Sequence, residues 1–213
     1  MSGRTRSEAS PLGGNLRRAQ LERGLSLRAL ARLLEVSPSL VSQIETGRIQ
    51  PSVRTLYAIV SELGVSLDEV FLDEPEQAPR PENGGGPPAE AQDARRVVQD
   101  GGRFVQRADE RSAIDLETGV RWERLTTHDV AGVEFLYVVY PPGSESAPAD
   151  ALVRHSGREL GFVRTGELTV TLGFEEYVLG PGDSVSFEST LPHRLHNAGS
   201  EVVTAVWIVL DRH

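Results

Sequence analysis

The chain contains no cysteine, no lysine and no apolar run long enough to cross a membrane. Without cysteine it can form neither disulfides nor thiolate metal sites. A membrane-spanning helix needs about 20 consecutive apolar residues, and the opening stretch MSGRTRSEASPLGGNL lacks the apolar core of a signal peptide. We therefore expect a cytoplasmic protein that has no membrane partner.

Negative charge is in excess over the whole chain but not in its first third. The formal net charge is −9, whereas residues 1–72 hold nine arginines and seven acidic residues, a net of +2, which leaves −11 for the rest. The negative charge of the second part repels nucleic acid, whereas the slightly positive first part does not. A DNA-binding function is therefore open only to the N-terminal part.

Residues 14–72 are expected to fold as five short helices. Leucines recur at three- and four-residue steps, as in LRALARLL. The last short helix, SLDEVF, begins at Ser66. Helix starts and ends are marked by serines in N-cap positions and by glycines, namely Ser26, Ser37 and Ser52, and Gly24, Gly47 and Gly64. This pattern predicts a compact all-α domain.

The composition then changes twice. Residues 73–94 contain five prolines and three consecutive glycines, so we expect a flexible linker there and a disordered N-terminus over residues 1–13. The alternative, an ordered loop of this length, would be unusual. Over residues 95–213, short segments such as VEFLYVVY and VVTAVWIVL predict an all-β domain, a sandwich or barrel. The expected fold class is thus α+β with two domains.

The segment SLRALARLLEVSPSLVSQIETGRIQPSVRTLYAIVSELGVSLDEVF resembles the helix-turn-helix domain of the lambda/434 repressor and Cro class of regulators, the Xre family. It shares the turn through Glu35 and Val36, the second helix SPSLVSQIETG with its following glycine, and the stretch QPSVRTL. The resemblance implies a transcriptional regulator that binds double-stranded DNA in a sequence-specific way.

The second helix of this motif is expected to read bases. Leu40, Val41 and Ile44 are spaced to face the core, which leaves small polar residues outward. The expected base-facing set is Pro38, Ser39, Ser42 and Gln43, and the expected phosphate contacts are Arg28, Arg48, Gln50, Ser52 and Arg54. For each serine, an ordinary exposed helix position remains the alternative.

A net charge of only +2 in residues 1–72 predicts weak DNA binding by one copy. Two copies that read two half-sites about 34 Å apart, or a multiple of that, would bind more tightly. We therefore expect a homodimer on a near-palindromic operator.

The stretch VRHSGRELGFVRTG, residues 153–166, places His155 four residues before Glu159 in a segment that otherwise predicts a β-strand. Residues separated by an even number along a strand point to the same face. Imidazole and carboxylate are ligands that divalent transition metals accept. These two residues are therefore candidates for a metal site.

The C-terminal part resembles a cupin, a small double-stranded β-helix of the jelly-roll type. The first cupin motif is carried by His155, Glu159 and Gly166, although Val153 stands where the family has its first histidine. The second motif runs from GPGD to PHRLHN and keeps His193 followed by Asn197, but it lacks the internal proline and glycine of the family pattern. The resemblance implies a barrel interior that can hold one small ligand.

Carried over from the cupin pattern, His155, Glu159 and His193 are three of the four usual metal ligands. Two histidines and one carboxylate with open positions are the set of non-haem iron(II) oxygenases, and they also suit zinc, nickel or manganese. The alternative is a pocket without metal, in which the three residues bind an organic ligand or hydrogen-bond to one another. The expected cofactor is thus one divalent transition metal ion, and no other cofactor is expected.

Two functions are compatible with this layout. In the first, the cupin domain binds a small-molecule effector or metal and modulates operator binding, which with a flexible linker requires direct contact between the domains. In the second, the chain is similar to hydroxypropylphosphonate epoxidases, iron enzymes that keep a helix-turn-helix domain. The outward polar face of SPSLVSQIETGRIQPS favours a regulator that is not an enzyme.

Overall fold

The structure, a computed structural model, describes residues 11–71 and 104–210. The predicted linker at 73–94 and most of the predicted disordered N-terminus at 1–13 lie outside these residues. The N-terminal part folds into helices α1 (Pro11–Glu22), α2 (Leu27–Leu33), α3 (Pro38–Glu45) and α4 (Val53–Leu63), followed by α5 (Leu67–Val70), which is a single turn. The predicted five-helix domain is confirmed only in part, because four helices exceed one turn, and α1 starts three residues before the expected Gly14.

The helix ends form where the sequence predicts them. Ser26, Ser37 and Ser52 each accept a hydrogen bond from the backbone N–H three residues ahead, over 3.2, 3.1 and 3.1 Å. These caps satisfy N–H groups that have no partner inside the helix. Gly64 closes α4 in the left-handed conformation with a φ of 57°, which glycine adopts at little cost.

The helices enclose one apolar core, to which α4 contributes most. Leu56 and Leu63 of α4 are fully buried, and Val41 and Ile44 of α3 are 2% exposed. Gly13 lets α1 approach α3 closely, because a Cβ atom at this position would lie 2.5 Å from the carbonyl oxygen of Ile44. α3 therefore has a fixed place in the domain, with its inner face in this core. None of the described helices is long and apolar enough to cross a membrane.

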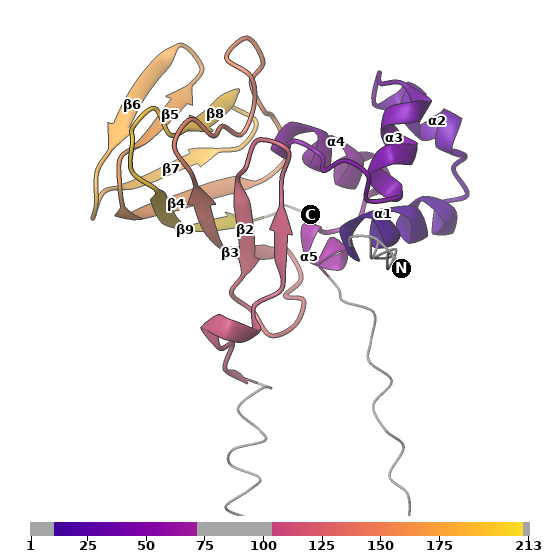
Figure 1. The fold of residues 1–213 in the computed structure, drawn as a ribbon, viewed down its shortest axis with the longest axis horizontal. Helices are drawn as coiled ribbons and strands as arrows, with labels where there is room; N and C mark the ends of the chain where they lie inside the picture. Colours follow the sequence, from indigo (N-terminus) through magenta and orange to yellow (C-terminus); the bar gives the residue numbers. More distant parts are fainter. Residues whose placement is uncertain (1–10, 72–103, 211–213) are drawn as a thin grey trace, which may run out of the picture.

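The C-terminal part is rich in β-structure, consistent with the predicted cupin. After the 3-10 helix η1 (Ala108–Glu110), two antiparallel sheets form, with strand orders β1-β2-β3-β9-β4-β7 and β6-β5-β8. The strands are β1 (Ala113–Asp115), β2 (Arg121–Arg124), β3 (Val133–Tyr140), β4 (Arg158–Thr165), β5 (Leu168–Leu172), β6 (Glu175–Leu179), β7 (Ser184–Glu188), β8 (His193–His196) and β9 (Val203–Leu210). The sheets form two layers that enclose the second core (Figure 1).

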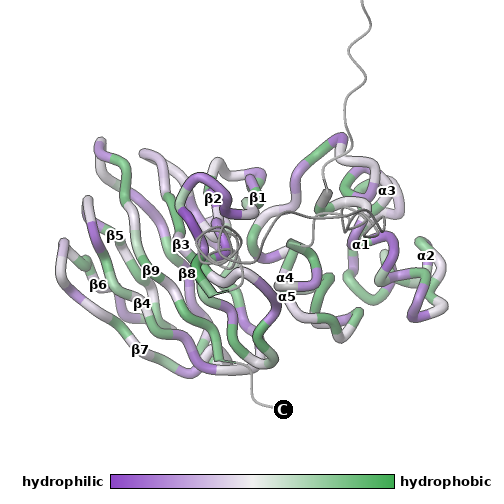
Figure 2. Tube along the Cα trace, turned by 90° about the horizontal axis from the view of Figure 1, so that it is seen from below, coloured by the Kyte–Doolittle hydropathy of each residue, from purple (hydrophilic) through white to green (hydrophobic). Residues whose placement is uncertain are grey.

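Every second residue of the central strands points into the interior of this barrel. In β9, residues Val203, Ala205, Trp207 and Val209 are buried and the residues between them are half-buried. The barrel tube in Figure 2 changes repeatedly between hydrophobic and hydrophilic along its strands. Two aromatic residues of this region lie outside the core, because Phe162 and Phe174 are 47% and 108% exposed.

The two domains pack directly against each other. Figure 1 shows α4 beside the barrel, whereas α2 and α3 lie on the side of the helical domain away from it. The backbone N–H of Glu117 donates to the carbonyl of Pro51 over 3.1 Å, and Tyr57 of α4 donates from its hydroxyl to Glu134 Oε2 over 3.2 Å. α4 therefore faces the helical core on one side and the barrel on the other.

Candidate metal centre and nucleic-acid interface

Three predicted ligands meet inside the barrel. Glu159 lies on β4, His155 in the segment just before it, and His193 at the start of β8. Nε2 of His155 lies 3.0 Å from Oε1 of Glu159, and Nε2 of His193 lies 3.1 Å from the same oxygen. All three ligand atoms lie within 4.8 Å of one another. The two sheets of the barrel therefore bring together residues that are up to 38 positions apart in the sequence.

The backbone sets which nitrogen of each imidazole faces the cluster. Nδ1 of His155 lies 2.9 Å from the carbonyl oxygen of Ser156, and Nδ1 of His193 lies 2.9 Å from that of Leu191. A carbonyl oxygen only accepts, so each Nδ1 must carry the proton. In the neutral form both Nε2 atoms then present a lone pair to the cluster, which is the form that binds a metal.

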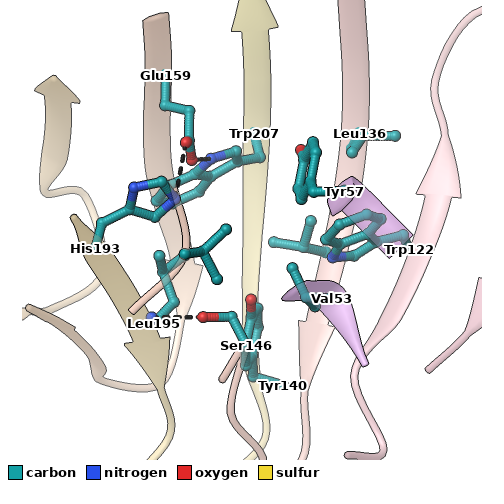
Figure 3. Close-up of a pocket in the computed structure, with 12 residues that line it drawn as sticks. Val53, Tyr57, Trp122, Leu136, Tyr140, Ser146, Glu159, His193, Leu195 and Trp207 are labelled. Atoms are coloured by element: carbon teal, nitrogen blue, oxygen red, sulfur yellow. Dashed lines mark hydrogen bonds and ion pairs between the residues drawn. The ribbon is translucent and has the colours of Figure 1, made fainter. Parts of the chain in front are cut away.

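Glu159 is oriented by a second contact. The indole Nε1 of Trp207 donates to Oε2 of Glu159 over 2.7 Å, and Figure 3 shows this contact together with that of His193. Oε1 is left for His155 and His193. Glu159 is 4% exposed. Burial by itself raises the pKa of this carboxyl group, but the contact with His155 and the nearby charge of His193 outweigh it and hold the pKa below its usual value. Glu159 is therefore the anionic centre of the site.

The two imidazoles respond differently to this anion. Burial lowers the pKa of His155, but its contact with Glu159 outweighs burial, so the net pKa is raised. Burial also lowers the pKa of His193, and Glu159 offsets this only in part, so the net pKa is lowered. In the absence of a metal, a proton on His155 is the favoured partner of Glu159.

The donor set fits a divalent cation. Nε2 of His155 and Oε1 of Glu159 are buried without a well-aligned hydrogen bond, although they are only 3.0 Å apart. Two nitrogen lone pairs and one carboxylate oxygen therefore converge with no donor among them once both imidazoles are neutral. Such a group is stabilised by a proton or a cation at its centre. Iron, zinc, nickel and manganese all accept these ligands.

A small cavity adjoins the cluster. Its volume is about 20 Å³, and its lining includes Val53, Tyr57, Trp122, Leu136, Tyr140, Val153, Glu159, His193 and Trp207. Val153, which stands where the cupin pattern has its first histidine, is 2% exposed and pairs with His193 across an isolated bridge. The isopropyl group of Val153 therefore forms part of the apolar wall of the cavity, at the position where the cupin pattern has a fourth ligand.

The residues predicted to contact DNA lie on and around α3. Pro38 and Ser39 are exposed, and Ser42 and Gln43 are half-buried on the same helix. Arg28, Arg48 and Arg54 are exposed, Gln50 is half-buried, and the Ser52 hydroxyl caps α4. α2 and α3, which carry Arg28 and the four predicted base-facing residues, lie on the side of the helical domain away from the barrel (Figure 1). Their contacts with DNA stay predictions.

Two site residues were missed by sequence reasoning. The sequence did not distinguish Trp207 from the other apolar residues of its strand, or Tyr57 from the other apolar residues of α4. Tyr57 stacks on the ring of His155, with centroids 4.1 Å apart and planes 6° from parallel. No local signal identifies these roles, because the partners lie 48 and 98 positions away in the sequence.

The comparisons with known proteins agree with both domains. Residues 16–70 match the family model described as Helix-turn-helix, and residues 127–209 match the one described as Cupin domain. The chain is 24% identical over 190 residues to the HTH-type transcriptional regulator PuuR of Escherichia coli (strain K12), covering 89% of each chain.

Solved structures show similar folds. A transcriptional regulator of the HTH_3 family from Vibrio cholerae superposes with a TM-score of 0.63 at 22% identity, covering 96% of this chain and 97% of the other. Hydroxypropylphosphonic acid epoxidase from S. wedmorenis gives a TM-score of 0.42 at 21% identity, covering 97% and 100% of the two chains, which is too low to support an argument about activity. With both matches, the chain is a transcriptional regulator that has an Xre-type helix-turn-helix domain and a C-terminal cupin domain.

Proposed function

We propose that this regulator binds its operator as a homodimer and that its cupin pocket senses a small effector with the help of a divalent metal ion. The observation that carries the sensing role is the convergence of His155, Glu159 and His193 on one point in a buried pocket. A bound ion would supply a Lewis-acidic centre with open positions for an oxygen or nitrogen donor. Trp207 would hold the carboxylate in its ligating orientation.

DNA reading is assigned to α3. Gln43 would form paired hydrogen bonds with adenine, with Pro38, Ser39 and Ser42 beside it in the major groove. The guanidinium groups of Arg28, Arg48 and Arg54, together with Gln50 and Ser52, would contact phosphates on either side. A role on bacterial DNA also implies a cytoplasmic location.

The outer face of the larger sheet supports dimer formation. Leu160 and Phe162 of β4 are 36% and 47% exposed and line an apolar groove with Val206 and Ile208 of β9. A second copy would cover this face and bring two copies of α3 to a near-palindromic site. Phe162→Glu should therefore convert a dimer to a monomer in light scattering, whereas Phe174→Glu, at a fully exposed turn position, should not.

The proposal is tested by elemental analysis and by gel shifts on the DNA upstream of the protein's own gene. We expect about one metal ion per chain and operator binding that changes when the metal is removed. His193→Ala should lose the metal, and His196→Ala, which changes a half-buried histidine outside the cluster, should keep it. Operator binding that is the same with and without metal would contradict metal sensing, and equal metal content in both variants would contradict the ligand set.

The cluster also supports a second candidate function, an iron(II)-dependent oxygenase. Two histidines and one carboxylate are the ligand set of such enzymes. Oxygen consumption by the iron-loaded protein with phosphonate substrates distinguishes the two. Turnover without sequence-specific DNA binding would favour the enzyme, and specific DNA binding without turnover favours the regulator.

A further inference from the structure

Helix α4 has two buried faces. Leu56, Ile59 and Leu63 pack into the helical domain, whereas Val53 and Tyr57 line the cavity of the barrel. Val53 and Tyr57 are four residues apart, so they lie on one face of the helix, one turn from each other. Figure 3 shows both side chains entering the pocket from the helix and facing Trp122 and Leu136. The DNA-binding domain therefore supplies part of the wall of the cupin pocket.

Tyr57 is held in the pocket by contacts with three barrel residues. Its ring stacks on His155 and meets Trp122 edge-on, with ring centroids 5.7 Å apart and planes at 61°. Its hydroxyl donates to Glu134 Oε2 over 3.2 Å. The residue is only 9% exposed. Stacked and edge-on ring pairs stabilise a contact beyond the burial of their surface, so Tyr57 helps to hold α4 against the barrel.

With Tyr57 in place, the pocket is too small for an organic molecule. The cavity of about 20 Å³ holds one water or one ion. Pockets that hold drug-sized organic ligands measure roughly 300–1,000 Å³. The three-ligand cluster can therefore take a metal ion while α4 is docked. A wider cavity of about 470 Å³ is lined by Tyr57, Glu134 and His155, so an organic molecule can reach Tyr57 from there. To enter the inner cavity beside Glu159 and His193, that molecule needs the space that Tyr57 occupies.

We infer that Tyr57 acts as a built-in plug of the effector pocket, and that an organic effector binds by displacing it and so undocks α4 from the barrel. This inference rests on the proposed function, since it assigns the regulation of the same pocket. The helical domain has a single core, so release of α4 moves α3 with it. In a dimer, that movement changes the relative placement of the two reading helices. The effector then discriminates between two domain arrangements, which is the requirement for coupling.

The docked arrangement can be measured without DNA or metal. The chain has no cysteine, so spin labels can be placed on Glu62→Cys of α4 and Phe174→Cys of the β5–β6 turn, both exposed positions. We expect one narrow distance distribution in the otherwise unchanged protein. Tyr57→Ala should broaden it and shift it to longer distances, whereas Tyr57→Phe keeps the ring stack and should leave it narrow. An unchanged distribution in Tyr57→Ala would overturn the inference.

Entry into the pocket can be measured with p-cresol, which has the shape of the tyrosine side chain. Trp122 and Trp207, the only two tryptophans in the chain, line the cavity and report binding by their fluorescence. We expect p-cresol to bind Tyr57→Ala at least about tenfold more tightly than the unsubstituted protein. In the unsubstituted protein only the fraction of molecules with an open pocket can bind, and the apparent affinity is lowered by that fraction. Equal affinity would overturn the inference. Tyr57→Gln provides the same comparison if Tyr57→Ala does not fold.

These outcomes separate the inference from the proposed function. If the unsubstituted protein binds no operator but Tyr57→Ala broadens the distances and admits p-cresol, the plug is real and the regulatory proposal fails. If the operator and metal results hold but both Tyr57 experiments show no change, the regulatory proposal stands and the plug is refuted.

Discussion

Trp207 donates the hydrogen bond from its indole Nε1 to Oε2 of Glu159 over 2.7 Å, in an environment where Glu159 is 4% exposed. The bond fixes the carboxylate so that its other oxygen faces both histidines. Hydrogen bonds of this kind around a metal ligand are worth about tenfold to a hundredfold in metal affinity. Trp207 therefore belongs to the candidate metal site although it donates no ligand atom.

Replacement of Trp207 by phenylalanine tests this role. Trp207→Phe keeps an aromatic ring but removes the N–H group, so metal affinity should fall about tenfold to a hundredfold. The measurement is a competition titration with a chromophoric zinc chelator. Trp122→Phe is the matched control, because the indole of Trp122 also lines the pocket but makes no described hydrogen bond to Glu159. Equal losses in both variants would show that ring volume, rather than the hydrogen bond, sets the affinity.

Gly161 gives an independent way to disturb the same contact. A Cβ atom at Gly161 would overlap the six-membered ring of Trp207 across the β4–β9 pair. Gly161→Ala should therefore displace the indole, lower stability by about 1–3 kcal/mol through overpacking, and weaken metal binding. Denaturant unfolding and the same chelator competition measure the two effects.

Gly14→Ala is the control for this substitution. A Cβ atom at Gly14 in α1 meets nothing within 4 Å. Alanine favours a helix over glycine by up to about 1 kcal/mol, so Gly14→Ala should be neutral or slightly stabilising and should keep the metal. Destabilisation by Gly14→Ala equal to that of Gly161→Ala would contradict a specific clash with Trp207.

Loss of a base contact and loss of a phosphate contact should change DNA binding in different ways. Gln43→Ala should cost about 1–3 kcal/mol on the preferred operator and relax the preference at one base pair. Arg48→Ala should weaken binding to all sequences alike and reduce the slope of log affinity against log salt by about 1. Gel shifts on operator variants at several salt concentrations measure both. An unchanged sequence preference in Gln43→Ala would remove Gln43 from the base-reading set.

Local features made much of the fold predictable from the sequence. The N-caps at Ser26, Ser37 and Ser52 depend on bonds over three residues, and strand alternation depends on a two-residue period. The ligand set His155, Glu159 and His193 could be placed because a known motif carries its spacing. Prediction from the sequence was therefore strongest where contacts are local or follow a family pattern.

Long-range contacts were the part that the sequence could not supply. VRTLYAIVSEL has apolar residues on more than one face of its helix, so nothing marks Tyr57 as the one that leaves its own domain for another. Phe162 and Phe174 are aromatic residues in or beside strands, yet one lies on the outer face of the sheet and the other at a turn. Which face of an element is covered depends on neighbours that are remote in the sequence.

Asn197 has a structural role that the cupin pattern alone does not explain. It is fully buried, its amide nitrogen donates to the carbonyls of Tyr140 and Glu201 over 2.8 and 2.7 Å, and its amide oxygen accepts from the N–H of Gly199 over 2.9 Å. These bonds tie the loop between β8 and β9 to the end of β3. They therefore fix the chain just after His193.

Replacement of Asn197 by alanine should strongly destabilise the barrel. Asn197→Ala leaves two carbonyls and one N–H without their partner in a buried place, at a cost of about 1–3 kcal/mol for each group that water cannot reach. We expect a loss of about 2–4 kcal/mol in the free energy of unfolding, measured with urea. Ser200→Ala changes an exposed residue of the same loop and should lie within about 0.5 kcal/mol of the unsubstituted protein. A loss below about 1 kcal/mol in Asn197→Ala would mean that water replaces the amide and that the loop does not depend on it.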